Sequence, residues 1–247
     1  ALAIRDLVEM SSPLLGIVID KRGTNQAMVV GALGLGMAAA LQGASSGLIL
    51  FIFALMLMSI SKNSFDIGSS AWAGASVPYA HRSRAIGMIE TTWALSFVIG
   101  MPIASVLIRA GTWRTPFIVI SILCVIVGIN FNHRLPANPP ISSLENGSRL
   151  SLTAKKVICA MIALGAGHMM MLVTFATFLE DEHNVSTSGL GFVAVIIGLA
   201  ELVGSGGVAL IGDKIGTVVV VKYALMLSLP LSIILPLGSS SLWLALL

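Results

Sequence analysis

Long apolar segments separated by short polar ones make up almost the whole chain. Between Gly23 and Ser61, 39 consecutive residues include no Lys, Arg, Asp, Glu or His, and only the turn-like run 42–47 interrupts their apolar character. A helix needs about 20 apolar residues to cross the hydrocarbon of a bilayer, so this stretch predicts two crossings. The same pattern predicts crossings at 1–19, 26–45, 48–75, 85–108, 115–131, 157–179, 189–211 and 217–237, with another beginning near Leu242.

The composition indicates a membrane protein. Hydrophobic residues account for 56% of the chain and charged residues for 10%, whereas soluble domains carry about 25% charged residues. Because a backbone in hydrocarbon must satisfy its own hydrogen bonds, and because the apolar runs are longer than the strands of a barrel, they favour helices. We therefore predict an all-α, polytopic membrane protein. The two cysteines, Cys124 and Cys159, lie in apolar segments and are predicted to be structural.

Basic residues are distributed unequally among the predicted connections. If alternate loops share a side, one side holds nine of them, Lys21, Arg22, Arg82, Arg84, Arg134, Arg149, Lys155, Lys156 and Lys214, and the other holds two, Arg109 and Arg114. By the positive-inside rule, we predict a multi-pass protein of the plasma membrane with cytoplasmic loops at 20–25, 76–84, 132–156 and 212–216. Topology thus accounts for the net charge of +3, and we predict no nucleic-acid partner.

The one long polar connection, 132–156, is rich in Pro, Ser, Asn and Gly and has basic residues at both ends. Such a composition is typical of a flexible linker. It is predicted to join a partial N-terminal helical bundle at 1–131 to a partial C-terminal bundle at 157–247. The chain starts and stops inside hydrophobic sequence, so we expect a fragment of a longer protein.

A short loop occurs twice, as Asp20-Lys21-Arg22-Gly23 and as Asp213-Lys214-Ile215-Gly216, 193 residues apart. A glycine also precedes each copy, at Gly16 and Gly212. The separation holds about six crossings, so the repeat predicts two similar helical halves in parallel orientation. Each aspartate ends a helix, where its carboxylate can accept hydrogen bonds from a neighbouring helix N-terminus and act as a conformational latch. Each loop glycine permits a tight reversal.

These residues resemble the major facilitator superfamily, whose members have twelve helices in two six-helix bundles. Gly16, Asp20, Lys21 and Gly23 are similar to the family signature between the second and third helices, and Asp213, Lys214 and Gly216 are similar to its echo between the eighth and ninth. The resemblance implies that the chain covers the second helix through the start of the tenth. It departs from the family pattern at 24–26, where Thr, Asn and Gln replace basic residues.

A second set of residues resembles the fifth-helix region of the same superfamily. Arg82 and Arg84 stand in the connection before it, and Gly87, Gly100 and Pro102 are similar to a signature found in its antiporters. Ser96 stands where that signature has Gly, and Met101 separates its Gly from its Pro. The resemblance implies antiport.

Ionisable residues in apolar spans are candidates for proton coupling or substrate binding, because each costs about 2.5–3.5 kcal/mol in the membrane centre without a partner. The candidates are Lys62, Asp66, Glu90, His168 and Glu201. Lys62 and Asp66 are four residues apart, so the alternative for them is an intrahelical ion pair. The alternative for Glu90 is pairing with the loop arginines. The alternative for Glu201 and His168 is a structural hydrogen bond between helices. Trp72, Trp93 and Trp113 are predicted interfacial anchors.

Together these features predict a secondary transporter that moves a small organic solute by alternating access, with proton-coupled efflux preferred. The alternatives are a proton-coupled uptake symporter and a membrane receptor or scaffold with the same fold. No enzyme is predicted, because no nucleophile with a nearby base and no cluster with metal-ligand spacing falls at a common depth. We predict no cofactor and no metal. The expected partners are the lipid bilayer, the solute and protons, with the protein acting as a monomer.

Overall fold

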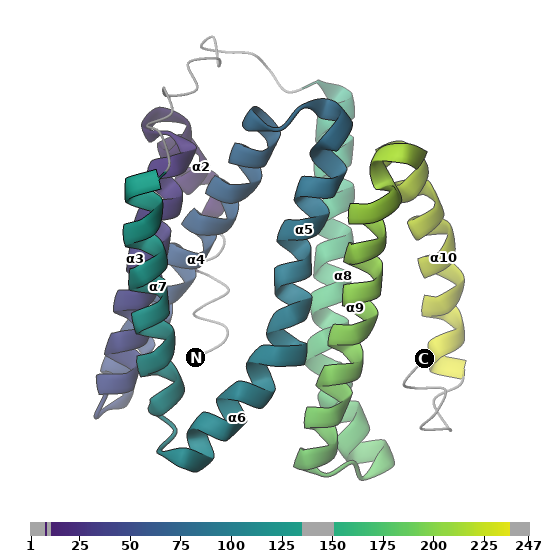
Figure 1. Ribbon diagram of the computed structural model, residues 1–247. Helices are drawn as coiled ribbons and strands as arrows, with labels where there is room; N and C mark the ends of the chain where they lie inside the picture. Colours follow the sequence, from purple (N-terminus) through teal and green to yellow (C-terminus); the bar gives the residue numbers. More distant parts are fainter. Residues whose placement is uncertain (1–7, 9–10, 135–150, 238–247) are drawn as a thin grey trace.

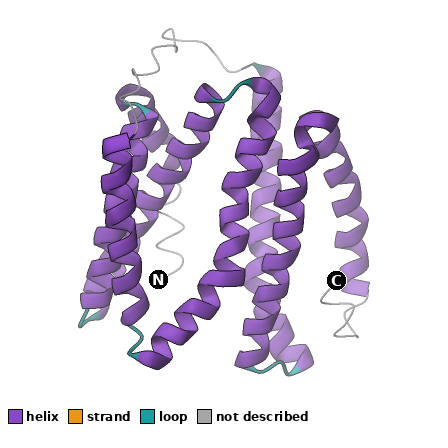
Figure 2. Cartoon of the chain, viewed as in Figure 1, coloured by secondary structure: helices purple, strands orange, loops and turns teal. Residues whose placement is uncertain are grey.

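The computed structural model describes residues 8, 11–134 and 151–237 of the chain. Every regular element in these ranges is a helix and none is a strand (Figure 2). The prediction of an all-α protein is therefore confirmed. The helices are α2 (Ser12–Arg22), α3 (Thr24–Ala44), α4 (Leu48–Ser76), η1 (Tyr79–His81), α5 (Arg82–Leu95), η2 (Ser96–Gly100), α6 (Met101–Ala110), α7 (Thr115–Arg134), α8 (Leu152–His183), α9 (Thr187–Ile215) and α10 (Thr217–Leu237).

Five stretches of the described residues are long and apolar enough to cross a membrane: Thr24–Ala44, Leu48–Ser76, Tyr79–Ala110, Thr115–Arg134 and Gly189–Ile215. Shorter apolar segments, Ile158–Met171 and Val219–Ser228, lie within α8 and α10. The prediction of a polytopic membrane protein is confirmed. Parts of other predictions, namely the start of the first crossing, positions 135–150 of the linker and the crossing near Leu242, lie outside the described residues.

The two repeated loops are shorter than predicted. Of the predicted loop 20–25, Gly23 alone lies outside a helix, and of 212–216, Gly216 alone does. Both glycines have a φ of 93°, a backbone conformation that residues with a Cβ avoid. A single glycine therefore reverses the chain, and the aspartate before it belongs to the last turn of its helix. The predicted linker is likewise shortened by helix at 132–134 and 152–156.

Helices α2, α3, α4 and α7 form one group, in which α3 contacts both α4 and α7 (Figure 1). Small residues bring these backbones together. A Cβ placed on Gly31 would lie 2.8 Å from the backbone nitrogen of Phe65 on α4, and one on Gly36 would lie 2.9 Å from Val125 Cγ2 on α7. Close backbone approach of this kind is how membrane helices gain packing energy, since lipid leaves little hydrophobic drive for association.

Helix α5 leaves this group and packs against α9, from the second half of the chain (Figure 1). A Cβ on Gly87 would lie 2.7 Å from the backbone nitrogen of Ala209, and one on Gly198 would lie 2.7 Å from Phe97 Cβ. The α5/α9 contact therefore joins the two halves, and positions 87 and 198 leave no room for a side chain larger than the hydrogen of glycine.

The predicted crossing 85–108 is present but is longer and is broken. It extends over Tyr79–Ala110, and the π-helical turn η2 separates α5 from α6. Pro102 lies in the first turn of α6, where its missing N–H removes a donor from the helical ladder. π-Helical turns and prolines are both recognised causes of bends in helices, so the interruption follows from the residues around Gly100 and Pro102.

Candidate functional site

The N-terminus of α5 is capped by a carboxylate from the other half of the chain. Asp213, in the last turn of α9, accepts a hydrogen bond from the backbone N–H of Ser83 at 2.9 Å through Oδ1 and one from Arg84 at 3.1 Å through Oδ2. The residue at the helix's own N-cap position, His81, makes no side-chain capping bond. Because free N–H groups and the helix dipole favour negative charge here, Asp213 supplies what α5 lacks locally.

The first copy of the loop has no equivalent contact. Asp20 is half-buried at the end of α2 and has no hydrogen bond or ion pair with the residues that the structure describes. Lys21 beside it and Lys214 beside Asp213 are both exposed, and a Cβ on Gly16 would meet no atom within 4 Å. Within the described ranges, Asp213 therefore caps a helix N-terminus, whereas the Asp20 carboxylate meets no such partner there.

Below this cap, a pair of hydroxyl groups links α5 to α9. Thr91 Oγ1 lies 3.3 Å from Ser205 Oγ, and one of these two hydroxyls donates to the other. The carbonyls of Gly87, 2.7 Å from Thr91 Oγ1, and of Glu201, 2.8 Å from Ser205 Oγ, are the alternative acceptors within each helix. Glu201 is half-buried one turn before Ser205. The predicted ionisable residue of α9 therefore lies beside the contact between the two halves.

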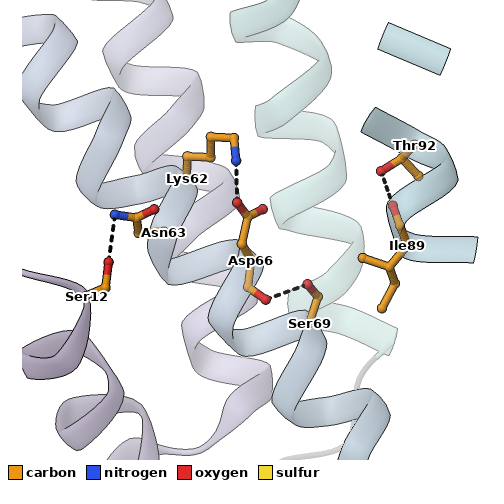
Figure 3. A network of polar contacts seen from close by, with 7 residues as sticks. All are labelled: Ser12, Lys62, Asn63, Asp66, Ser69, Ile89 and Thr92. Atoms are coloured by element: carbon orange, nitrogen blue, oxygen red, sulfur yellow. Dashed lines mark hydrogen bonds and ion pairs between the residues drawn. The ribbon is translucent and has the colours of Figure 1, made fainter. Parts of the chain in front are cut away.

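A second polar cluster surrounds Lys62 on α4. The ammonium group of Lys62 forms an ion pair with Asp66, and it also lies over the ring of Trp93 on α5, 5.3 Å from the ring centroid. Asn63 points the other way and donates to Ser12 Oγ on α2 at 3.2 Å (Figure 3). The structure thus contains the intrahelical ion pair that the spacing of Lys62 and Asp66 allows, and it adds an aromatic partner from another helix.

The charged side chains of this cluster are partly exposed on the surface of the described residues. The side chains of Lys62 and Asp66 are 45% and 49% exposed, and Trp93 packs edge-on against Phe97 at a centroid distance of 5.6 Å. Ser69, one turn beyond Asp66, donates to its backbone carbonyl at 3.0 Å (Figure 3). Both charges can therefore reach a solute without unfolding of either helix.

The other predicted residues occupy three different places. Glu90 is exposed on α5, three residues before Trp93. His168 lies in α8, but its side chain is outside the described part of the chain. Lys62 and Asp66 lie on α4, Glu90 on α5 and Glu201 on α9, and no contact among the described side chains joins them into one site.

The residues of the fifth-helix signature have structural contacts. Arg82 donates through Nε to the carbonyl of Val77 at 3.1 Å, and its guanidinium lies 5.8 Å from the ring centroid of Tyr79. These contacts fix the turn that precedes α5. Arg84 contributes its backbone N–H to Asp213. The remaining members, Gly87, Gly100 and Pro102, lie at the α9 contact and at the π-helical turn.

Trp93 has a contact that its place in the sequence does not reveal. The sequence pattern predicts it as an interfacial anchor, which stays a prediction; the structure adds its contact with the ammonium group of Lys62, near the middle of the Tyr79–Ala110 stretch. The signal available in the sequence was its spacing from Glu90, because residues three apart share a helix face. Ser83, Thr91 and Ser205 were missed altogether, since small hydroxyl residues are common in membrane helices and their pairing depends on tertiary contacts.

Comparisons with known proteins agree with this architecture. A family model described as Major Facilitator Superfamily matches residues 10–247. The chain is also similar to a protein of Bacillus subtilis (strain 168) named as an uncharacterized MFS-type transporter, YwfA, with 22% identity over 111 residues. That match includes 45% of this chain and spans 27% of the relative. No solved structure matches.

Proposed function

The chain belongs to the major facilitator superfamily, and we propose that the protein of which it is part moves a small organic solute by alternating access. Membership confirms the resemblance of the repeated loop motifs. It makes the chain part of a multi-pass membrane protein in a superfamily of transporters rather than of enzymes. The proposal adds a mechanism, a direction and a coupling ion.

The observation that carries the proposal is the contact of α5 with α9. In alternating access, two bundles close at one face of the membrane and part there when the other face opens. The contact joins the two halves through one carboxylate, one pair of hydroxyl groups and close backbone packing. None of these is a covalent link or a buried ion pair, so the contact can form and break repeatedly. Asp213 then acts as the latch of the closed face.

We further propose proton-coupled efflux across the plasma membrane. Glu201 supports proton coupling because it is half-buried one turn from Ser205, at the contact that must open. Glu90 and His168 are additional titratable groups in apolar spans. Antiport is supported by Gly87, which lies at the α5/α9 contact. In this proposal the basic loops face the cytoplasm, and the predicted linker connects the two bundles along the chain. The protein works as a monomer in the bilayer.

The test is flux by the full-length protein in liposomes, measured with and without a pH difference for a panel of organic solutes. We expect the pH difference to drive accumulation against a solute gradient, and Glu201→Gln to abolish this drive while solute exchange continues. Glu180→Gln, at an exposed position near the end of α8, is the matched control. Unchanged coupling in Glu201→Gln would exclude that side chain. The sign of the pH effect separates antiport from symport, and absence of flux for every solute would favour a receptor.

A further inference from the structure

The ammonium group of Lys62 is held by two groups that together suit an organic cation. One is the carboxylate of Asp66 and the other is the face of Trp93. A carboxylate beside an aromatic face attracts an ammonium ion through its charge and through the ring quadrupole. We propose that Asp66 and Trp93 form a binding site for an organic cation, and that Lys62 occupies this site as an internal competitor when no ligand is bound. This inference rests on the proposed transport function and specifies its substrate class.

The geometry allows Lys62 to leave. Its ammonium is carried by a flexible stem of four carbons, and nearly half of the side chain is exposed. The bond to Asp66 is between residues four apart on α4, whereas the ring of Trp93 comes from α5. A ligand that enters between α4 and α5 therefore meets both groups, and it can displace the lysine by rotation of that side chain alone.

The local charge favours a cation over an anion. Lys62 and Asp66 cancel one another, and Glu90 adds a negative charge on α5. Glu90 lies three residues before Trp93, about one helical turn along the same helix. When a monovalent cation takes the place of Lys62 beside Asp66, the net charge of Lys62, Asp66, Glu90 and the ligand becomes zero. An anionic ligand would instead bring the total to minus two, which is costly in a membrane protein.

The proposed site and the contact between the two halves lie on the same helix, α5. Trp93 lies on α5, and the same helix contacts α9 through Gly87 and Thr91. Positions 87, 91 and 94 are spaced by four and three residues and so share one face of the helix. Trp93 is two residues after Thr91 and therefore points to a different face. A ligand against Trp93 therefore lies on the other side of α5 from the latch contact.

The experiment measures equilibrium binding of tetraphenylphosphonium to the full-length protein in detergent. Tetraphenylborate, an anion of almost the same size and shape, is the matched probe. We expect saturable, displaceable binding of the cation and none of the anion. Asp66→Asn should weaken cation binding about tenfold and Trp93→Leu about fivefold, while Trp93→Phe retains most of it.

If Lys62 competes with the ligand, its removal should strengthen cation binding, whereas removal of Asp66 or Trp93 should weaken it. Lys62→Gln should tighten cation binding about threefold, because an exposed ion pair no longer has to be broken, and Lys62→Arg should leave it close to wild type. Asp181→Asn, exposed at the end of α8, is the control for a lost carboxylate. Monodisperse elution of each variant checks folding, and if Asp66→Asn fails that check, the Lys62 and Trp93 variants decide the question.

Several results would overturn the site. One is saturable binding of tetraphenylborate that is lost in Lys62→Gln, and another is weaker cation binding in Lys62→Gln than in wild type. Equal cation affinity in Trp93→Leu and wild type, or no cation binding at all, would also overturn it. Cation binding with the expected pattern but without pH-driven flux would contradict the transport function and leave the site intact. Conversely, pH-driven flux of another solute without cation binding would contradict this site alone.

Discussion

Removing the carboxylate of Asp213 should open the contact between the two halves. The substitution Asp213→Ala deletes both hydrogen bonds to the first turn of α5, from Ser83 at 2.9 Å and from Arg84 at 3.1 Å. It leaves the close packing around Gly87 in place. Because His81 offers no side-chain cap of its own, the N–H groups of α5 then depend on water, and α9 loses its polar attachment to the start of α5.

The size of the effect follows from capping energetics. Loss of an N-cap side chain costs about 0.5–2 kcal/mol, and loss of a negative charge at a helix N-terminus costs about 0.3–1 kcal/mol at exposed positions. Asp213 is partly exposed, so we expect the two effects together to change the equilibrium between closed and open forms about tenfold. Asp213→Asn keeps one acceptor and should produce a smaller shift in the same direction.

The assay is a distance measurement between spin labels on the two halves. Gln26 and Val219 are exposed and lie three residues after Gly23 and Gly216 respectively, so cysteines there report on equivalent ends of the two bundles. The background replaces Cys124 and Cys159 by alanine, since both are free thiols. We expect the longer-distance population to rise about tenfold relative to the shorter one in Asp213→Ala. Identical distance distributions in the variant and the parent would refute the latch.

Three further predictions concern the same contact and its glycines. An ideal Cβ on Gly212 lies 3.1 Å from that of Ser83, and a separation of the two helices by about half an ångström brings this distance into the range of a disulfide. The pair Ser83→Cys and Gly212→Cys should therefore form a disulfide that stops flux until a reductant is added; full flux in the oxidised form would count against the proposal. Gly87→Ala should weaken the α5/α9 contact and lengthen the spin-label distance, whereas Gly204→Ala, with no atom within 4 Å, should not. The same distance in both variants would show that close packing at Gly87 does not hold the two halves together. Gly216→Ala also meets no neighbouring atom, but at a φ of 93° it should lower the free energy of unfolding by about 1–3 kcal/mol, which thermal denaturation in detergent can measure against Gly204→Ala.

The fold class and most of the crossings could be predicted because they depend on local physics. A run of apolar residues long enough to span hydrocarbon is visible in the sequence itself, as for Leu48–Ser76 and Thr115–Arg134. The repeated Asp-to-Gly loop was equally visible. Its exact form was not, because the number of residues that a reversal needs depends on backbone conformation, and Gly23 and Gly216 achieve it with one residue each.

The pairing of α5 with α9 could not be predicted from hydropathy. Gly87 and Ala209 are ordinary small residues in apolar runs, and their contact joins positions more than a hundred residues apart. The π-helical turn at Ser96–Gly100 escaped prediction for a similar reason. Hydropathy averages over a whole span, whereas a change of hydrogen-bond pattern within the span depends on a few residues and on their neighbours.

The candidate site was predictable where its chemistry is local. The spacing of Lys62 and Asp66 indicated an intrahelical pair, and the structure contains it. The ring of Trp93 was unpredictable as a partner, since α4 and α5 meet only through tertiary packing. The assignment of roles in proton coupling and substrate binding to these residues stays a prediction, which the binding and flux experiments test.

The π-helical turn at Ser96–Gly100 has a mechanical consequence for the long span that contains it. The turn divides the span into α5, which packs on α9, and α6, which contacts α7 in the first half of the chain. A movement of α5 can be taken up by bending at this π-helical turn, so that α6 in the other leaflet keeps its position. Separation at one membrane surface therefore need not loosen the opposite surface, and this independence distinguishes a carrier from a leaking pore.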